Sequence, residues 1–181
     1  MAETEGRVSA PLARREAMWR LARAAGVAAP VLGFLEGRVS ALPRGEETDL
    51  AVLHAALAIE HEAIALYDLA LKRSLFPAGL RSYAVEFRGD HLGHRDTQVA
   101  IAEERGGRPP DQRAGYGFAP LTNGDAALRQ ALAIELLAQD AYTALISQIR
   151  TKDYLLSAAF ILVDEVRHLT VWRRVLGLKI Y

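Results

Sequence analysis

The amino-acid sequence predicts an all-α fold, a four-helix bundle with one long crossover between the second and third helices. Apolar residues recur at spacings of three and four over four long stretches, which is the period of helices that bury one face. Clusters of Gly, Pro and polar residues separate these stretches by a short, a long and a short link. Short links join antiparallel neighbours, whereas a long link can cross the end of a bundle.

The helix bounds follow from capping and breaking residues. Thr48 or Asp49 can cap the first helix, and Pro77 ends it and suits the first turn of the next. The crossover, residues 108–124, reads RPPDQRAGYGFAPLTNG and has too many breakers for a helix. A bundle is therefore expected over 48–177, with a short C-terminal tail at 178–181. The predicted helices cover about 48–76, 78–105, 124–150 and 154–176.

Composition and charge exclude several classes of protein. The chain has 181 residues, of which 51% are hydrophobic, so it can build one domain with a real core. Lys plus Arg and Asp plus Glu both number 22, and this balance argues against nucleic-acid binding driven by bulk charge. The sequence contains no cysteine, which excludes disulfides, thiolate metal sites and rubredoxin-type electron transfer within the chain.

Residues 1–47 are expected to be an N-terminal arm or a twin-arginine-type export signal. Arg14 and Arg15 precede a short apolar run at 24–35, and the small residues ending at Ala41 suit a cleavage site. An exported or periplasmic protein is the favoured interpretation, and a cytoplasmic protein with a short amphipathic arm is the alternative. The apolar run is too short for a transmembrane helix, so no integral membrane protein is expected.

The pentapeptide ALAIE occurs twice, ending at Glu60 and Glu135, an offset of 75 residues (135 − 60 = 75). A tyrosine follows each glutamate seven positions later, at Tyr67 and Tyr142. Both glutamates sit on apolar helical stripes, where a carboxylate is costly to bury unless it has a partner. The repeat therefore raises the question of which partner the two buried carboxylates share.

The second and fourth predicted helices repeat in the same way. Residues 90–94 read DHLGH and residues 164–168 read DEVRH, so His94 and His168 are 74 residues apart (168 − 94 = 74). The halves look like two copies of one helical hairpin packed about a pseudo-twofold axis. Chance similarity between alanine- and leucine-rich helices is the alternative, and the matching polar positions make it the weaker one.

Residues three apart on a helix share a face, so Glu165 and His168 point together. His91 and His94 do the same, and Asp90 on that side is the alternative to His91. Carboxylates and imidazoles that converge from four helices are typical of a dinuclear metal site, whose cations would offset the buried negative charge. The candidate metal ligands are Glu60, His91, His94, Glu135, Glu165 and His168.

Other polar residues are expected behind these ligands. Asp90 and Asp164 can each orient an imidazole by a hydrogen bond to the ring nitrogen that faces away from the metal. Arg167 is expected to pair with a carboxylate. The alternative to a metal site is a metal-free core, in which the glutamates pair with His or Arg and the histidines are hydrogen-bonded core residues.

Three motifs in order resemble the ferritin-like, rubrerythrin-type diiron-carboxylate family over about residues 48–176. They are Glu60-x6-Tyr67, Glu135-x6-Tyr142, and residues 164–168, which look like the family's DExRH signature. The resemblance implies two iron ions, or manganese in their place, and oxidoreductase or ferroxidase-type chemistry with oxygen or peroxide. It names neither a substrate nor a redox partner. It also implies that the two tyrosines hydrogen-bond ligand glutamates.

The second helix departs from the family pattern because His91 stands where a bridging glutamate is expected. Imidazole cannot bridge two metals as a carboxylate does, and it removes one negative charge. Three outcomes follow: two metals with His91 as a terminal ligand, one metal, or none. The runner-up function is accordingly a ferritin-like bundle with a degenerate metal site that acts as a structural or stress-related binding module. A homodimer is one expectation for its partners.

Overall fold

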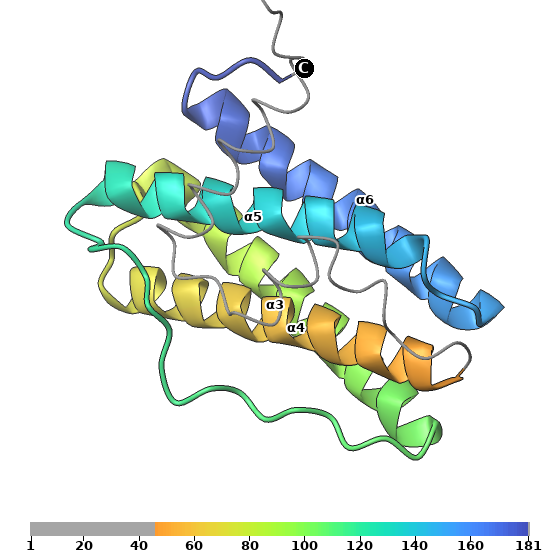
Figure 1. The fold of residues 1–181 in the computed structure, drawn as a ribbon. Helices are drawn as coiled ribbons and strands as arrows, with labels where there is room; N and C mark the ends of the chain where they lie inside the picture. The colour runs from red at the N-terminus through yellow and green to blue at the C-terminus, as the bar shows by residue number, and fades with distance from the viewer. Residues whose placement is uncertain (1–45, 181) are drawn as a thin grey trace, which may run out of the picture.

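The computed structural model describes residues 46–180, so the arm or export signal predicted over 1–47 lies almost entirely outside the described residues. Within 46–180 the chain is helical and has no strand, and the predicted all-α four-helix bundle with one long crossover is confirmed (Figure 1). The elements are α3 (Glu46–Lys72), the 3-10 turn η2 (Ala78–Leu80), α4 (Arg81–Glu104), α5 (Gly124–Ile146) and α6 (Lys152–Val175).

The helices pack as two hairpins. α3 lies against α4, and α5 lies against α6, while α3 and α5 join the hairpins; contact between α4 and α6 is much sparser. The crossover runs back along α3 to the start of α5 (Figure 1), and His61 of α3 meets it, with Nε2 3.3 Å from the Pro110 carbonyl oxygen. It ends at Asn123, whose side-chain oxygen accepts from the Ala126 amide at 2.9 Å and caps α5.

The core explains the apolar character of α3. This helix is long and apolar enough to cross a membrane by length and composition, but 67% of its most apolar window is buried inside the bundle. Leu53, Leu57, Ile64 and Tyr67, which share one face of the helix at helical spacing, are all buried. The apolar face is therefore the one that the other helices cover.

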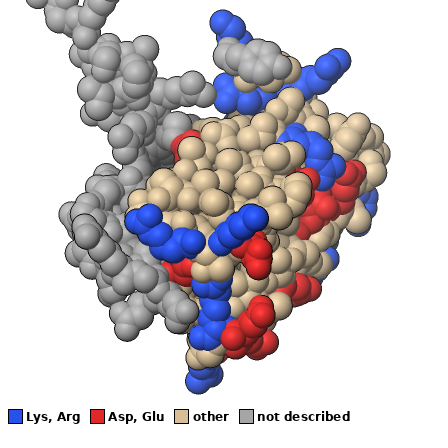
Figure 2. All heavy atoms as spheres, turned by 90° about the vertical axis from the view of Figure 1, so that its right-hand side faces the viewer, with Lys and Arg blue, Asp and Glu red and all other residues tan. Residues whose placement is uncertain are grey.

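The surface carries charges of both signs. On the face drawn in Figure 2, Lys and Arg side chains are interspersed with Asp and Glu side chains around uncharged surface. Among the described residues on this face there is no continuous basic area, which agrees with the zero net charge of the chain.

Two predicted helix ends are wrong. The first helix ends at Lys72 rather than near Phe76, because Ser74 adopts a φ of 53° and reverses the chain. Phe76 then folds back onto the core and stacks on Tyr67 and Trp172. The third helix ends at Ile146 rather than near 150, and the residues after it enter the turn before α6.

Asp49 is also not the cap of its own helix. It lies inside α3 with 0% exposure, and its carboxylate accepts from the backbone amides of Arg150 and Thr151 at 2.9 and 3.0 Å. The Thr151 hydroxyl donates to it at 2.7 Å, and Arg105 Nη1 does so at 3.1 Å. One carboxylate therefore ties α3 to the end of α4 and to the turn before α6.

The same contacts set the charge state of Asp49. Burial alone would raise the pKa of this carboxyl, but the Thr151 hydroxyl, the two backbone amides and Arg105 outweigh it and hold the pKa below its usual value of 3.8. Because the folded-state pKa is lowered, the stability that this group contributes is fully present above the unfolded-state pKa and is lost as pH falls through the folded-state pKa.

We expect Asp49→Asn to lower the free energy of unfolding at pH 7 by about 3 kcal/mol, because buried donors lose a charged acceptor. The difference from wild type should shrink as pH falls below about 4. Urea denaturation at several pH values measures both effects. Asp111→Asn, at a crossover residue whose side chain is 91% exposed, is the control and should change little. A loss at Asp49 that did not depend on pH would contradict the charged role.

Candidate metal centre

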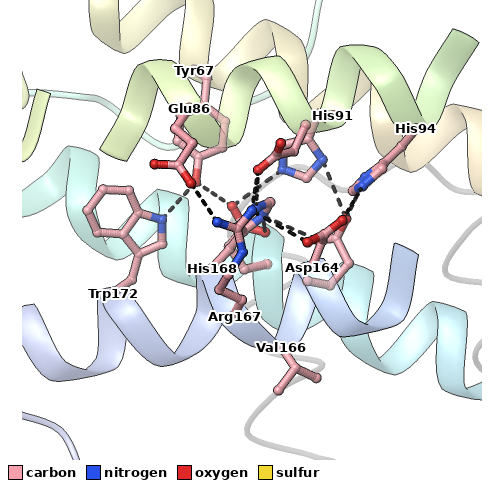
Figure 3. Close-up of polar contacts among 12 residues, drawn as sticks. Tyr67, Glu86, His91, His94, Asp164, Val166, Arg167, His168 and Trp172 are labelled. Atoms are coloured by element: carbon pink, nitrogen blue, oxygen red, sulfur yellow. Dashed lines mark hydrogen bonds and ion pairs between the residues drawn. The ribbon is translucent and has the colours of Figure 1, made fainter. Parts of the chain in front are cut away.

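All four helices deliver side chains to one buried cluster at the centre of the bundle (Figure 3). Each ligand sits on the buried stripe of its helix, so the pattern that forms the core also brings the polar groups together. Every member has 0% exposure except His94, at 7%. The cluster consists of Glu60 from α3, His91 and His94 from α4, Glu135 from α5, and Glu165 and His168 from α6.

The six side chains form two overlapping sets, each able to hold one metal ion. In each set, one potential ligand atom per residue lies within 4.8 Å of the others. His91 and Glu165 belong to both sets, whereas the remaining four residues belong to one set each. The first set is Glu60, His91, His94 and Glu165, and the second is His91, Glu135, Glu165 and His168.

His91 occupies the middle of the cluster and reaches all three carboxylates. Its Nδ1 lies 2.8 Å from Glu60 Oε2 and 3.6 Å from Glu165 Oε1. Its Nε2 lies 3.4 Å from Glu135 Oε1. The residue that breaks the sequence motif is thus placed between the carboxylates, where the predicted bridging glutamate would stand.

Glu165 differs from His91 because both oxygens of its buried carboxylate lack hydrogen-bond donors within the described part of the chain. Neither of its oxygens accepts a hydrogen bond from any described residue, and His94 Nδ1, 3.2 Å from Glu165 Oε1, also lacks a hydrogen-bond partner there. Leaving such groups unpaired in a dry core is costly. These atoms without hydrogen-bond partners, in residues that belong to the two sets, fit a bound cation.

Burial and the neighbouring charges perturb the cluster strongly. Burial raises the pKa of Glu165 to about 7. Burial would also raise the pKa of Glu60, but the hydrogen bond with His91 and the nearby His94 ring, 3.6 Å away, outweigh it and lower that pKa to about 2. Burial would lower the pKa of His94, but Glu165 and Glu60 raise it to about 10. These shifts favour the imidazolium form of His94 and the carboxylate form of Glu60, and they move Glu165 toward its neutral form.

The tyrosines connect the two halves crosswise. The Tyr67 hydroxyl from the first half donates to Glu135 Oε1 in the second, and the Tyr142 hydroxyl donates to Glu60 Oε1. Each glutamate thus keeps its second oxygen for the cluster. The predicted hydrogen bonds from tyrosine to glutamate are present, but each joins opposite hairpins rather than one helix.

Sequence reasoning missed the residues that hold these tyrosines. Trp172 Nε1 donates to the Tyr67 hydroxyl at 2.7 Å, and Gln98 Nε2 donates to the Tyr142 hydroxyl. Both residues have 0% exposure. Trp172 and Gln98 stand four residues after His168 and His94, so they are also related by the 74-residue offset. Comparing the two halves over one more helical turn would have paired them.

The two aspartates also act across the halves. Asp90 Oδ2 lies 3.0 Å from His168 Nε2, and Asp164 Oδ2 lies 3.4 Å from His94 Nε2. Contact at Nε2 leaves Nδ1 of each ring facing the carboxylates, as in His168 Nδ1, 3.3 Å from Glu135 Oε2. Asp90 therefore lies behind His168, in the orienting position that the sequence favoured for it.

Arg167 pairs with carboxylates, as expected, and Glu86 is a partner that the sequence did not reveal. Its Nη1 lies 2.5 Å from Glu86 Oε1, and its Nη2 lies 2.6 Å from Asp90 Oδ2. A weaker contact of 3.4 Å joins it to Asp164 Oδ1. We refer to the group of Arg167, Glu86 and Asp90, which spans α4 and α6, as the latch.

Comparison with known proteins agrees with this architecture. Residues 48–178 match the model of the ferritin-like domain. The solved structure of a conserved hypothetical protein, rv2844, from Mycobacterium tuberculosis is similar, with a TM-score of 0.68 and 29% identity over 72% of this chain and 91% of that chain. No curated protein matches the sequence. Because the family match covers most of the chain, this protein belongs to the ferritin-like family.

Proposed function

We propose that the chain binds two divalent metal ions, iron or manganese, and reacts with oxygen or peroxide as an oxidoreductase of the ferroxidase type. The observation that supports it is the pair of overlapping ligand sets that share His91 and Glu165. Carboxylate and imidazole ligands suit iron and manganese. Two such ions, when bound, supply the electrons or the Lewis acidity that oxygen chemistry needs.

The protein's own residues would organise this site in defined ways. Tyr67 and Tyr142 hold one oxygen of Glu135 and Glu60, so each carboxylate has a fixed direction. The aspartates fix which imidazole nitrogen faces inward. The apolar core around the cluster keeps water out and strengthens every charge interaction inside it.

A degenerate, metal-free site is the second candidate, and the position of His91 favours it. Its ring lies within 3.6 Å of oxygens from all three glutamates. An imidazolium there offsets buried negative charge, as a metal would. In that case the bundle would be a structural or stress-related binding module, and the cluster would serve stability alone.

We expect about two metal ions per chain after anaerobic loading with Fe2+, about one for Glu60→Gln, and fewer than one for Glu165→Gln. The reason is that Glu60 belongs to one ligand set and Glu165 to both. Elemental analysis of desalted protein measures the ratio, and circular dichroism checks folding. Glu103→Gln, on the exposed side of α4, is the matched control.

The outcome separates the two candidates. Oxygen consumption by the loaded protein, measured with an electrode, would support the oxidoreductase. Metal binding without oxygen consumption would leave a binding site only. No retained metal in the wild type would contradict the proposal and favour the metal-free module.

We expect His91→Glu to make the fold depend on metal. Without metal, a fourth buried carboxylate replaces the central imidazole, and the free energy of unfolding should fall by about 3 kcal/mol. With metal, the added carboxylate supplies the bridging ligand of the family motif. The rise in melting temperature on adding Mn2+ should therefore be larger than in wild type. An equal rise in both proteins would show that His91 does not stand in for a ligand.

Export is proposed separately, because residues 1–45 lie outside the described residues. Processing after Ala41 would leave a mature chain that begins just before α3. We expect the mass of the mature protein from the periplasm of an expressing bacterium to match this cleavage, and Arg14→Lys with Arg15→Lys to prevent it. An unprocessed cytoplasmic chain would contradict export. The homodimer likewise stays a prediction.

A further inference from the structure

The candidate metal centre lies behind the seam where α4 and α6 face each other. This pair of helices makes the sparsest long-helix contact in the bundle. Four of the six candidate ligands come from these two helices, namely His91, His94, Glu165 and His168. The seam is therefore the least tightly packed helix pair beside the cluster.

One end of the seam is closed. Phe87 stacks on His168 with ring centroids 4.0 Å apart, and the Arg167 guanidinium lies over Phe87 at 5.7 Å. The latch then joins α6 to α4 through Glu86 and Asp90, on the outside of His168 (Figure 3). The side chain of His168 has 0% exposure as a result.

The other end of the seam lacks residues equivalent to those that close the first end. The 74-residue offset relates Arg167 to Gly93 and Glu86 to Phe160, so the cation and one of its two acceptors are both missing there. Apart from its chain neighbours and the backbone of its own helix, no atom of the described residues lies within 4 Å of the position that a Cβ at Gly93 would occupy. Phe160 is 65% exposed and has no charged group to pair with a cation. Only Asp164, the counterpart of Asp90, is retained.

Exposure of the ligands agrees with an opening at this end. The His94 side chain is 9% exposed, whereas the other five candidate ligands have side chains with 0% exposure. Its ring spans from Glu165 Oε1, 3.2 Å from Nδ1, to Asp164 Oδ2, 3.4 Å from Nε2. Asp164 itself is 39% exposed, so a carboxylate that solvent can reach stands directly outside the least buried ligand.

We propose that divalent cations enter the cluster through the Gly93 end of the seam, with Asp164 as their first carboxylate contact and His94 as the ligand that they meet next, while the latch closes the other end. Gly93 is the residue that determines access, because it leaves free the position that an arginine fills on the opposite side. This inference rests on the proposed metal site. It adds an entry route for the cation and gives Gly93 and Asp164, which lie outside the two ligand sets, a part in that route.

Gly93→Arg tests the route by restoring the missing cation of the latch. The substitution adds bulk and positive charge beside Asp164, and an arginine suits a helix better than glycine, so folding should survive. Stopped-flow mixing with Co2+, followed by its visible absorption, reports binding without any turnover. We expect the binding rate to fall about tenfold, as loss of electrostatic attraction and of open space predicts, with an unchanged final amount of bound Co2+.

Gly89→Arg is the matched control, since it is an open glycine one turn earlier in α4 and should bind Co2+ at the wild-type rate. A wild-type rate in Gly93→Arg would overturn the proposal. So would a faster rate of similar size in Glu86→Ala, which opens the latch but leaves the contact between Arg167 and Asp164 in place, because entry would then lie at the latched end. Absence of Co2+ binding in the wild type would instead overturn the proposed metal site, so the two failures are distinguishable.

Discussion

Burial of three carboxylates at the centre of one small bundle is the constraint on which the rest of the structure depends. Glu60, Glu135 and Glu165 all have 0% exposure, and isolated buried charges of this kind would unfold the domain. Three imidazoles lie among them and can offset this charge before any metal binds. The fold must therefore deliver six polar side chains to one point from four helices, which fixes the register of every helix relative to the others.

The crosswise hydrogen bonds show how this register is held. Tyr67 and Tyr142 each reach the glutamate of the opposite hairpin, and Trp172 and Gln98 each hold one tyrosine. Neither hairpin supplies the tyrosine that holds its own glutamate, so the halves are interdependent despite their similar sequences. Asp49 likewise joins distant segments at the end of the bundle, where its carboxylate links α3 to the turn before α6. Such shared networks favour one packing over its near alternatives.

Much of this was predictable from local pattern. The spacing of Glu60, His91 and the other candidate ligands on apolar stripes was sufficient to place them in one cluster, because helical periodicity fixes direction. Contacts between distant residues were less accessible. The sequence indicated that Arg167 meets a carboxylate but could not select Glu86, since the choice depends on how α4 and α6 lie across the seam. Asp49 looked like a cap of its own helix because a capping residue is recognised by its neighbours in sequence, whereas its partners lie about a hundred residues away.

The places where the two halves diverge are more informative than the places where they agree. The duplicated positions that keep their identity, the glutamates, tyrosines, aspartates and outer histidines, maintain the shared cluster. The positions that differ are His91 and Glu165 at the centre, Gln98 and Trp172 behind the tyrosines, and Gly93 and Arg167 at the seam, each pair related by the 74-residue offset. A symmetric scaffold with an asymmetric surround gives its two ligand sets, each of two carboxylates and two imidazoles, different support and different access. Two ions bound there would not be equivalent, and the set that contains His94, at the open end, is the one that solvent reaches first.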